Sequence, residues 1–413
     1  MDSVAIISAR HILFTIGIIL LIGTLGSLAA QRFKIPDVVI FLLAGLLCGP
    51  ELAGIITVQA DSTLNQLVLI FGSSYILFDG GASVRLKIIR EVWITVLVIS
   101  TVGLLITALL TSFCAVELFG IPLLTALLLG CTIASTDPAT LIPVFTQIRI
   151  KERVAQTVIS ESACNDAMGA IITFSIMGLV CGSKGTFSLL TTVTDLIGAA
   201  SIGIITGALL GYLAALLIAH ERYGFLQEYA PLVTLMAVLG SYMTAEGFHA
   251  SGFMSVFVFG IVIGNKELVG FAMNSREGEK LEDFILTTSL MMRMFIFILL
   301  GSQVDLKLIG DHLGSGVLLV LIFMLVIRPI TVFCCALPDR RAGWSLKEML
   351  FMSWTRETGV IPGALAGMML AMKIPGSDTI AAITFITILM TITIQGTTTG
   401  WMAGKLGLKM EDR

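Results

Sequence analysis

Charge is scarce in this chain. Only 13% of its 413 residues are Asp, Glu, Lys or Arg, and the net charge is −3. Because no surplus of basic residues exists, no nucleic-acid partner is expected. Hydrophobic residues make up 56% of the sequence. This balance excludes a soluble domain and predicts an all-α polytopic membrane protein with short loops, in contact with lipid.

Motifs for enzymatic chemistry are missing as well. None of the seven cysteines has the CxxC spacing of a metal site, and most lie inside apolar runs as small packing residues. There is no nucleotide-binding motif, so ATP does not drive the expected activity. Nothing resembles a protease motif. We therefore expect a protein that is not an enzyme and has no cofactor.

Apolar runs of about 20 residues, long enough to cross a bilayer, can be marked by their charged interruptions. We count about thirteen, at roughly 11–30, 37–54, 65–82, 93–115, 121–147, 155–182, 190–219, 227–247, 250–265, 284–304, 313–336, 347–372 and 378–403. Of the 25 Lys and Arg residues, eighteen lie on the face that follows odd-numbered spans, four on the opposite face and three within spans. The positive-inside rule then places the N-terminus outside the cell membrane and the C-terminus in the cytoplasm.

The two halves of the chain resemble each other. The matching segments are Leu43–Gly49 with Val258–Gly264, Gly81–Lys87 with Gly301–Lys307, and Pro138 with Pro362, at offsets of 215, 220 and 224 residues. The partners are seven spans apart, an odd number, so the two repeats are expected to be inverted in the membrane. Inverted repeats are typical of secondary transporters, whose substrate site lies near the bilayer midplane.

Two neighbouring spans carry carboxylates in their middle, in Ser135–Pro138 and Glu161–Asp166. An ionisable group there costs at least about 2.5–3.5 kcal/mol on insertion scales and therefore indicates a functional site. Pro138 disfavours helix at Asp137, and a broken helix leaves free carbonyl groups that can bind a cation. The pattern indicates a carboxylate that holds either a cation or a proton.

Helical geometry divides the second segment into two faces. Ser162 and Asp166 lie 40° apart on one face, and Glu161 and Asn165 lie 40° apart on the next. The first face can present a hydroxyl and a carboxylate to an ion. The second can engage a cationic side chain, because a buried Glu161 needs one. The candidates within spans are Arg293 and Arg328.

The STDPAT and ESACNDAMG segments, Arg293 in MMRMFIFILLG and Arg328 in IRPI together resemble the NhaP-type branch of monovalent cation/proton antiporters. The resemblance implies a sodium/proton antiporter fold with two broken helices crossing at the ion site. It makes Asp166 the carrier of cation or proton and Glu161 with Arg328 a structural ion pair. The implied companions in the ion site are Asp137, Ser162, the Thr136 carbonyl and Asp79, with Asn165 and Arg293 in support.

The same resemblance implies exchange of Na⁺ or Li⁺ for H⁺ and a homodimer. Its expected parts are interface helices 1–3 in residues 1–92, core helices 4–6 in 93–185, linker and interface helices 7–10 in 186–308, and core helices 11–13 in 309–413. Asn165 favours electroneutral one-for-one exchange, because an asparagine releases no proton. The alternatives are a K⁺/H⁺ antiporter of the same fold and, from other classes, a cation channel or an intramembrane hydrolase with an aspartate dyad.

One motif departs from the pattern of the family. Thr358 precedes Gly359 where relatives often have arginine, and Arg356 and Glu357 stand upstream. We expect these two residues to pair with each other near a helix end. Gly359, with Pro362 and Gly363, suits a second broken helix facing the Asp137 break.

Overall fold

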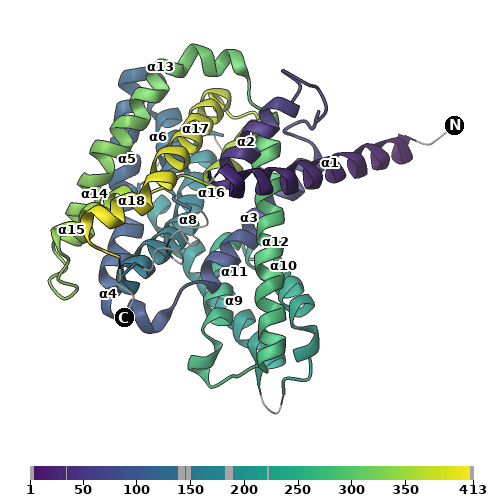
Figure 1. The fold of residues 1–413 in the computed structure, drawn as a ribbon, viewed down its shortest axis with the longest axis vertical. Coiled ribbons are helices and arrows are strands. Elements are labelled where there is room, and N and C mark those ends of the chain that lie inside the picture. Colours follow the sequence, from purple (N-terminus) through teal and green to yellow (C-terminus); the bar gives the residue numbers. More distant parts are fainter. Residues whose placement is uncertain are drawn as a thin grey trace.

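The computed structural model describes residues 4–33, 35–137, 145, 150–181, 189–220 and 223–409. These residues are almost entirely helical (Figure 1). The first half contains α1 (Val4–Phe33), α2 (Asp37–Cys48), α3 (Thr63–Ala82), α4 (Leu86–Val98), η1 (Ile99–Gly103), α5 (Leu104–Phe119), α6 (Leu123–Ala134), α8 (Glu152–Val180) and α9 (Leu189–Ala219). The second contains η2 (Gln227–Tyr229), α10 (Ala230–Gly247), α11 (Gly252–Gly264), η3 (Lys266–Val269), α12 (Ser275–Ser302), α13 (Leu306–Ile322), η4 (Phe323–Ile327), α14 (Arg328–Ala336), α15 (Leu346–Trp354), α16 (Val360–Ala371), α17 (Ser377–Thr391), η5 (Ile392–Gly396) and α18 (Thr397–Leu406).

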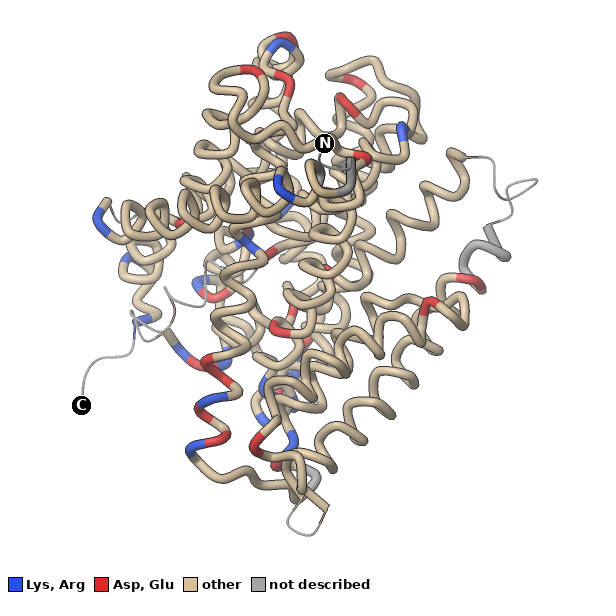
Figure 2. The backbone as a smooth tube through the Cα atoms, turned by 90° about the vertical axis from the view of Figure 1, so that its right-hand side faces the viewer, with Lys and Arg blue, Asp and Glu red and all other residues tan. Residues whose placement is uncertain are grey.

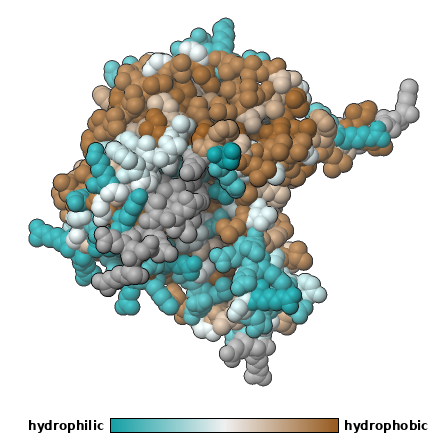
Figure 3. Space-filling model, in the orientation of Figure 1, coloured by the Kyte–Doolittle hydropathy of each residue, from teal (hydrophilic) through white to brown (hydrophobic). Residues whose placement is uncertain are grey.

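Many of these helices are suited to a bilayer. Among the described residues, seven continuous helical runs are long and apolar enough to cross one, and the shorter helices α2, α6, α11 and α16 are apolar too. Hydrophobic side chains cover the upper part of the face in Figure 3, and most of the chain is uncharged, drawn tan in Figure 2. The all-α polytopic class is confirmed, whereas the count of thirteen spans stays a prediction.

Two long helical runs are built alike. The run α4–η1–α5 and the run α13–η4–α14 each contain a five-residue π-helical segment, at Ile99–Gly103 and Phe323–Ile327. The offset of 224 residues that relates the segments also relates Thr107 to Thr331, and the hydroxyl groups of these two threonines lie 3.0 Å apart. Contact between equivalent residues is what a two-fold relation between repeats produces.

The helix pairs α2–α12 and α3–α11 show the same repeat in their contacts. A side chain on Gly45 would collide with the main-chain oxygen of Ile298, and one on Gly260 with that of Phe78. The sequence offsets of 215 and 220 residues convert the first contact into the second. In both pairs, glycine lets two backbones approach more closely than any side chain allows.

The reciprocal contacts obey the same rule. A side chain on Gly301 would collide with the main-chain oxygen of Leu42, and one on Gly81 with that of Phe257. These two contacts are again related by the same offsets. The internal repeat predicted from sequence is therefore present as a repeat of close helix–helix contacts.

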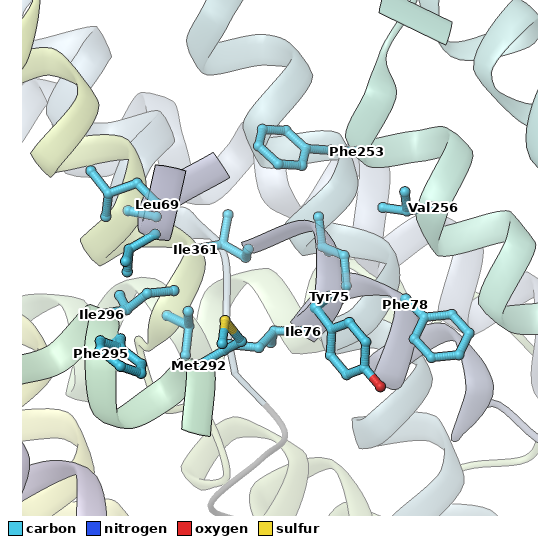
Figure 4. Close-up of a cluster of buried hydrophobic side chains, with 14 of the residues drawn as sticks. Leu69, Tyr75, Ile76, Phe78, Phe253, Val256, Met292, Phe295, Ile296 and Ile361 are labelled. Atoms are coloured by element: carbon cyan, nitrogen blue, oxygen red, sulfur yellow. The ribbon is translucent and has the colours of Figure 1, made fainter. Parts of the chain in front are cut away.

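The largest hydrophobic cluster lies where these pairs meet α16 (Figure 4). Tyr75 and Phe78 of α3, Phe253 of α11 and Ile296 of α12 contribute to it, together with Ile361 near the start of α16. Around this cluster, α9 and α10 pack against α11, α10 also contacts α12, and α8 and α16 contact α3. Helix α1 projects away from the bundle towards the N-terminus (Figure 1).

Candidate cation-binding site

In the described part of the chain, one helix ends and another is interrupted in the interior of the molecule. Helix α6 ends at Ala134, and Ser135 continues in extended backbone. Helix α15 ends at Trp354, and residues 355–359 are non-helical until α16 begins at Val360. Pro138, the predicted cause of the first break, lies outside the described residues. Pro362 lies in the first turn of α16, where its missing N–H costs no helical hydrogen bond.

The two interruptions satisfy each other's free backbone groups. The Asp137 amide donates to the Glu357 carbonyl at 2.8 Å, and the Val360 amide donates to Asp137 Oδ2 at 3.2 Å. The Arg356 guanidinium donates to the Ala134 carbonyl at the end of α6. A carboxylate thus lies at a helix N-terminus and a cation at a helix C-terminus, the arrangement that the helix dipoles favour. The end of α6 and the α15–α16 break therefore meet, as the predicted crossing of two broken helices requires, while the continuation of the first helix lies outside the described residues.

Gly359 is required by this crossing. A Cβ at this position would overlap the Asp137 side chain. Any other residue at 359 would therefore push Asp137 away from the start of α16. This steric requirement explains why the glycine stands directly before the helix.

Helix α8 packs its polar face against the first break. Asn165 binds Thr136 with both ends of its amide: Oδ1 accepts from the Thr136 N–H at 3.0 Å, and Nδ2 donates to Thr136 Oγ1 at 2.8 Å. Ser162 Oγ donates to the Thr136 carbonyl at 2.5 Å and accepts from Thr136 Oγ1 at 3.0 Å. Asn165 therefore holds the extended segment that follows α6. It does not engage a cationic side chain, which was the role expected for its face of the helix.

Asp166 lies one residue beyond Asn165 and differs from its neighbours. The residue is 4% exposed, and its Oδ1 has no hydrogen-bond partner among the described residues. Asp137 and Arg356 are the charged groups that act on it. Asp166 follows Ser162 by one helical turn on α8, and its neighbour Asn165 binds Thr136, so this carboxylate oxygen lies near the first break without being used by the fold.

Asp79 approaches this group from α3. It is half-buried, and its interacting neighbours are Ser289 and Arg293 of α12 and, at longer range, Asp137. The next residue, Gly80, packs against Ala163 of α8. The structure therefore brings Asp79 to the edge of the site, with Arg293 beside it.

Glu161 of α8 and Arg328 of α14 form a bidentate ion pair. Both oxygens of Glu161 accept from the guanidinium at 2.7 Å, and Arg328 Nη2 also donates to the Met352 carbonyl at 3.1 Å. Each residue is 1% exposed. Of the two arginines considered for Glu161, the structure selects Arg328. Planar pairs of this kind fix geometry as well as charge.

The expected pairing of Arg356 with Glu357 is wrong. Arg356 turns to Ala134 and lies over the Phe323 ring, 5.3 Å from its centroid. Both carboxylate oxygens of Glu357 lack a hydrogen-bond partner among the described residues. Sequence pattern placed the pair at a helix end, but the break lies in the interior, so both side chains are buried. The sequence did contain a signal for this burial: the two charged residues stand close to Gly359, the glycine expected at a break in a helix.

Comparison with known proteins identifies the family. Residues 17–405 match the family described as "Sodium/hydrogen exchanger, transmembrane". The chain belongs to this family. It is 32% identical to Na(+)/H(+) antiporter 1 of Methanocaldococcus jannaschii over 95% of each chain. It is also 26% identical to the K(+)/H(+) antiporter NhaP of Alkalimonas amylolytica, over 93% of this chain and 65% of that longer protein.

Solved exchanger structures agree with the fold. The structure of the sodium proton antiporter MjNhaP1 from M. jannaschii at pH 8 superimposes with a TM-score of 0.81 at 30% identity. That match covers 96% of this chain and 99% of MjNhaP1. The crossing of broken helices therefore belongs to a sodium/hydrogen exchanger fold, and the chain is a multi-pass membrane protein.

Proposed function

We propose that this exchanger moves Na⁺ or Li⁺ across the cell membrane in exchange for H⁺. The observation that carries the proposal is Asp166: a fully enclosed carboxylate with an unused oxygen, beside the crossing of two broken helices. The sodium/proton antiporters among its relatives support the choice of cation.

The chemistry follows from competition at one carboxylate. An unpaired carboxylate in the membrane interior is costly, so Asp166 is neutralised either by a proton or by a small cation. Oxygen ligands suit hard cations, and we propose Asp137, Ser162 and the Thr136 carbonyl as further ligands, because Ser162 and Asn165 of α8 bind Thr136, the neighbour of Asp137. Binding of the cation therefore requires release of the proton, and the reverse. Neither a cofactor nor a covalent step is needed.

Asn165 supports one-for-one stoichiometry. Its amide is committed to Thr136 and has no proton to release. Only one of the two adjacent side chains, Asp166, then alternates between a proton and a cation. Exchange of one Na⁺ for one H⁺ moves no net charge.

Alternating access would come from movement between two groups of helices. We assign α4–α6, α8 and α13–α18 to a moving core, and α1–α3 with α9–α12 to a dimer interface. The site lies where these groups meet, since α3 contacts both α8 and α16. We also assign the N-terminus to the outside and the C-terminus to the cytoplasm, on the distribution of Lys and Arg.

Two other functions are distinguished by the same experiment. A relative named as a K⁺/H⁺ antiporter raises potassium as the substrate, and a cation channel would conduct without counterflow of protons. In proteoliposomes with an imposed pH gradient, we expect Na⁺ and Li⁺, added separately, to dissipate the gradient without changing the membrane potential. Dissipation by K⁺ alone would assign the second substrate, and sodium flux without proton movement would refute exchange.

A further inference from the structure

Glu357 is a second buried carboxylate, and the function described above does not use it. The residue is 0% exposed, and neither Oε1 nor Oε2 has a hydrogen-bond partner among the described residues. Its main-chain carbonyl binds the Asp137 amide, so Glu357 belongs to the crossing of the broken helices. Its side chain lies elsewhere, next to η5 and the start of α2.

The position of that side chain is given by Gly396. A Cβ on Gly396 would lie 3.0 Å from Glu357 Oε1 and 3.1 Å from Pro36 Cγ. The carboxylate is therefore held between the π-helical segment η5 and the residue that precedes α2. Helix α2 also contacts η5 directly, and Figure 1 shows α2 beside the α17–α18 run. The absence of a side chain at Gly396 leaves room for the carboxylate.

Residues adjacent to this contact also carry unused polar atoms. Gln395, the neighbour of Gly396, is 0% exposed, and neither its Oε1 nor its Nε2 has a partner in the described part of the chain. Thr358, the neighbour of Glu357, is also 0% exposed with an unused Oγ1. Buried polar groups normally have partners, so a cluster of unused ones on adjacent residues indicates that a ligand completes it.

The chemistry of the cluster favours a cation as that ligand. No basic side chain among the described residues neutralises Glu357, since Arg356 is directed to Ala134 and Arg328 to Glu161. A proton on Glu357 would neutralise its charge but would not by itself provide partners for both ends of the Gln395 amide and for the Thr358 hydroxyl. A cation, by contrast, uses both carboxylate oxygens together with amide and hydroxyl oxygens, the ligands that hard ions prefer.

We infer that Glu357, together with Gln395 and Thr358, forms a second monovalent-cation site next to the Asp166 site, on the side of the α1–α2 junction. The two sites share the Asp137–Glu357 backbone contact but use different side chains. The inference rests on the proposed exchange function only for the identity of the cation. The site lies between the predicted moving core and α2, where relative movement of the two groups would open it.

The test is equilibrium binding of radioactive Na⁺ to the purified, detergent-solubilised chain at constant pH. Asp166→Asn removes the first site, and this variant should still bind Na⁺. Adding Glu357→Gln to it should weaken the remaining binding at least about tenfold, which corresponds to about 1.4 kcal/mol. Glu246→Gln, which changes a carboxylate that binds the Gly252 amide on α10–α11, is the matched control and should leave binding unchanged.

A second substitution tests whether weaker binding reflects loss of the site rather than loss of folding. Gln395→Leu in the Asp166→Asn background should also weaken Na⁺ binding, while monodisperse size-exclusion profiles show that the protein is folded. If Asp166→Asn binds no Na⁺, or if Glu357→Gln leaves its binding unchanged, the second site does not exist and Glu357 is a permanently protonated side chain. Failure of the proposed exchange would appear separately, as absence of Na⁺-dependent proton movement in the wild-type protein.

Discussion

Two fully buried glutamates in this molecule have opposite environments. Glu161 on α8 accepts two hydrogen bonds from Arg328, whereas Glu357, between α15 and α16, has no partner for either oxygen among the described residues. They are similarly enclosed, at 1% and 0% exposure. Burial alone therefore does not tell a structural carboxylate from one available to an ion. The presence or absence of a basic or hydrogen-bonding partner makes this distinction. By that criterion Asp166, with its unused oxygen, resembles Glu357 rather than Glu161.

Glu161→Ala should cause the largest loss of stability. It would leave Arg328 buried and unpaired, which typically costs about 3–5 kcal/mol. We expect a large drop in folded yield and in thermal stability in detergent, measured by fluorescence-detected size exclusion. A double variant, Glu161→Ala with Arg328→Met, should recover part of the loss. Normal stability of the single variant would show that the pair is dispensable.

Gly359→Ala should disturb the crossing without removing any charge. The added methyl group would overlap Asp137, and overpacking of this kind costs about 1–3 kcal/mol. We expect lower thermal stability and slower exchange in the same sample. Gly363→Ala, four residues further along the chain, would meet the end of the flexible Leu300 side chain at 2.9 Å and should have the smaller effect. Equal effects of the two substitutions would contradict the special role of Gly359.

Asp137→Ala should have an intermediate effect on stability and a clear effect on transport. It removes the acceptor for the Val360 amide, a capping loss of about 1 kcal/mol. It also removes an oxygen from the proposed Asp166 site. The apparent Michaelis constant for Na⁺ in proteoliposomes should rise severalfold. An unchanged constant would exclude Asp137 from the ion site.

Glu357→Gln tests the difference between Glu161 and Glu357 most directly. Because no basic partner is left behind, we expect the free energy of unfolding to change by less than about 1 kcal/mol. The thermal stability of Glu357→Gln should thus stay near the wild-type value, whereas Glu161→Gln should fall well below it. A large loss for Glu357→Gln would mean that this carboxylate has a structural partner and is not comparable with Asp166.

Substitution of Asp339, which lies outside the spans, should have the smallest effect on stability, and that effect should depend on pH. Burial raises the pKa of Asp339, but hydrogen bonds from Thr95 and from the Ala342 and Arg341 amides outweigh it, and the pKa lies below its usual value. A lowered pKa stabilises the fold above the pKa of the unfolded chain, and this contribution is lost as pH falls through the folded-state pKa.

Asp339→Asn should therefore lower the melting temperature slightly at neutral pH, by an amount that shrinks as the pH falls below about 4, the usual aspartate value. Melting curves of both proteins across pH test this. A difference that grows at acid pH would contradict the assigned direction.

The sequence was sufficient for the features that depend on local pattern. Apolar runs predicted the helices, and the matched segments predicted an internal repeat, because both follow from spacing along the chain. The partner of Glu161 stayed open between two arginines, and the fates of Arg356 and Glu357 were missed. Those outcomes depend on where a break lies in three dimensions: Arg356 reaches Ala134, which is 222 positions away in the chain. A local sequence pattern cannot predict a contact between residues so far apart in the chain.

The role of Asp166 is tested most directly by reconstituting the Asp166→Asn variant and measuring Na⁺-driven dissipation of a pH gradient beside the wild type. Asparagine preserves the size of the side chain but can be neither ionised nor protonated in the same way. We expect a folded protein without Na⁺-dependent proton movement, whereas the wild type exchanges. Exchange by Asp166→Asn at a rate near that of the wild type would contradict the account.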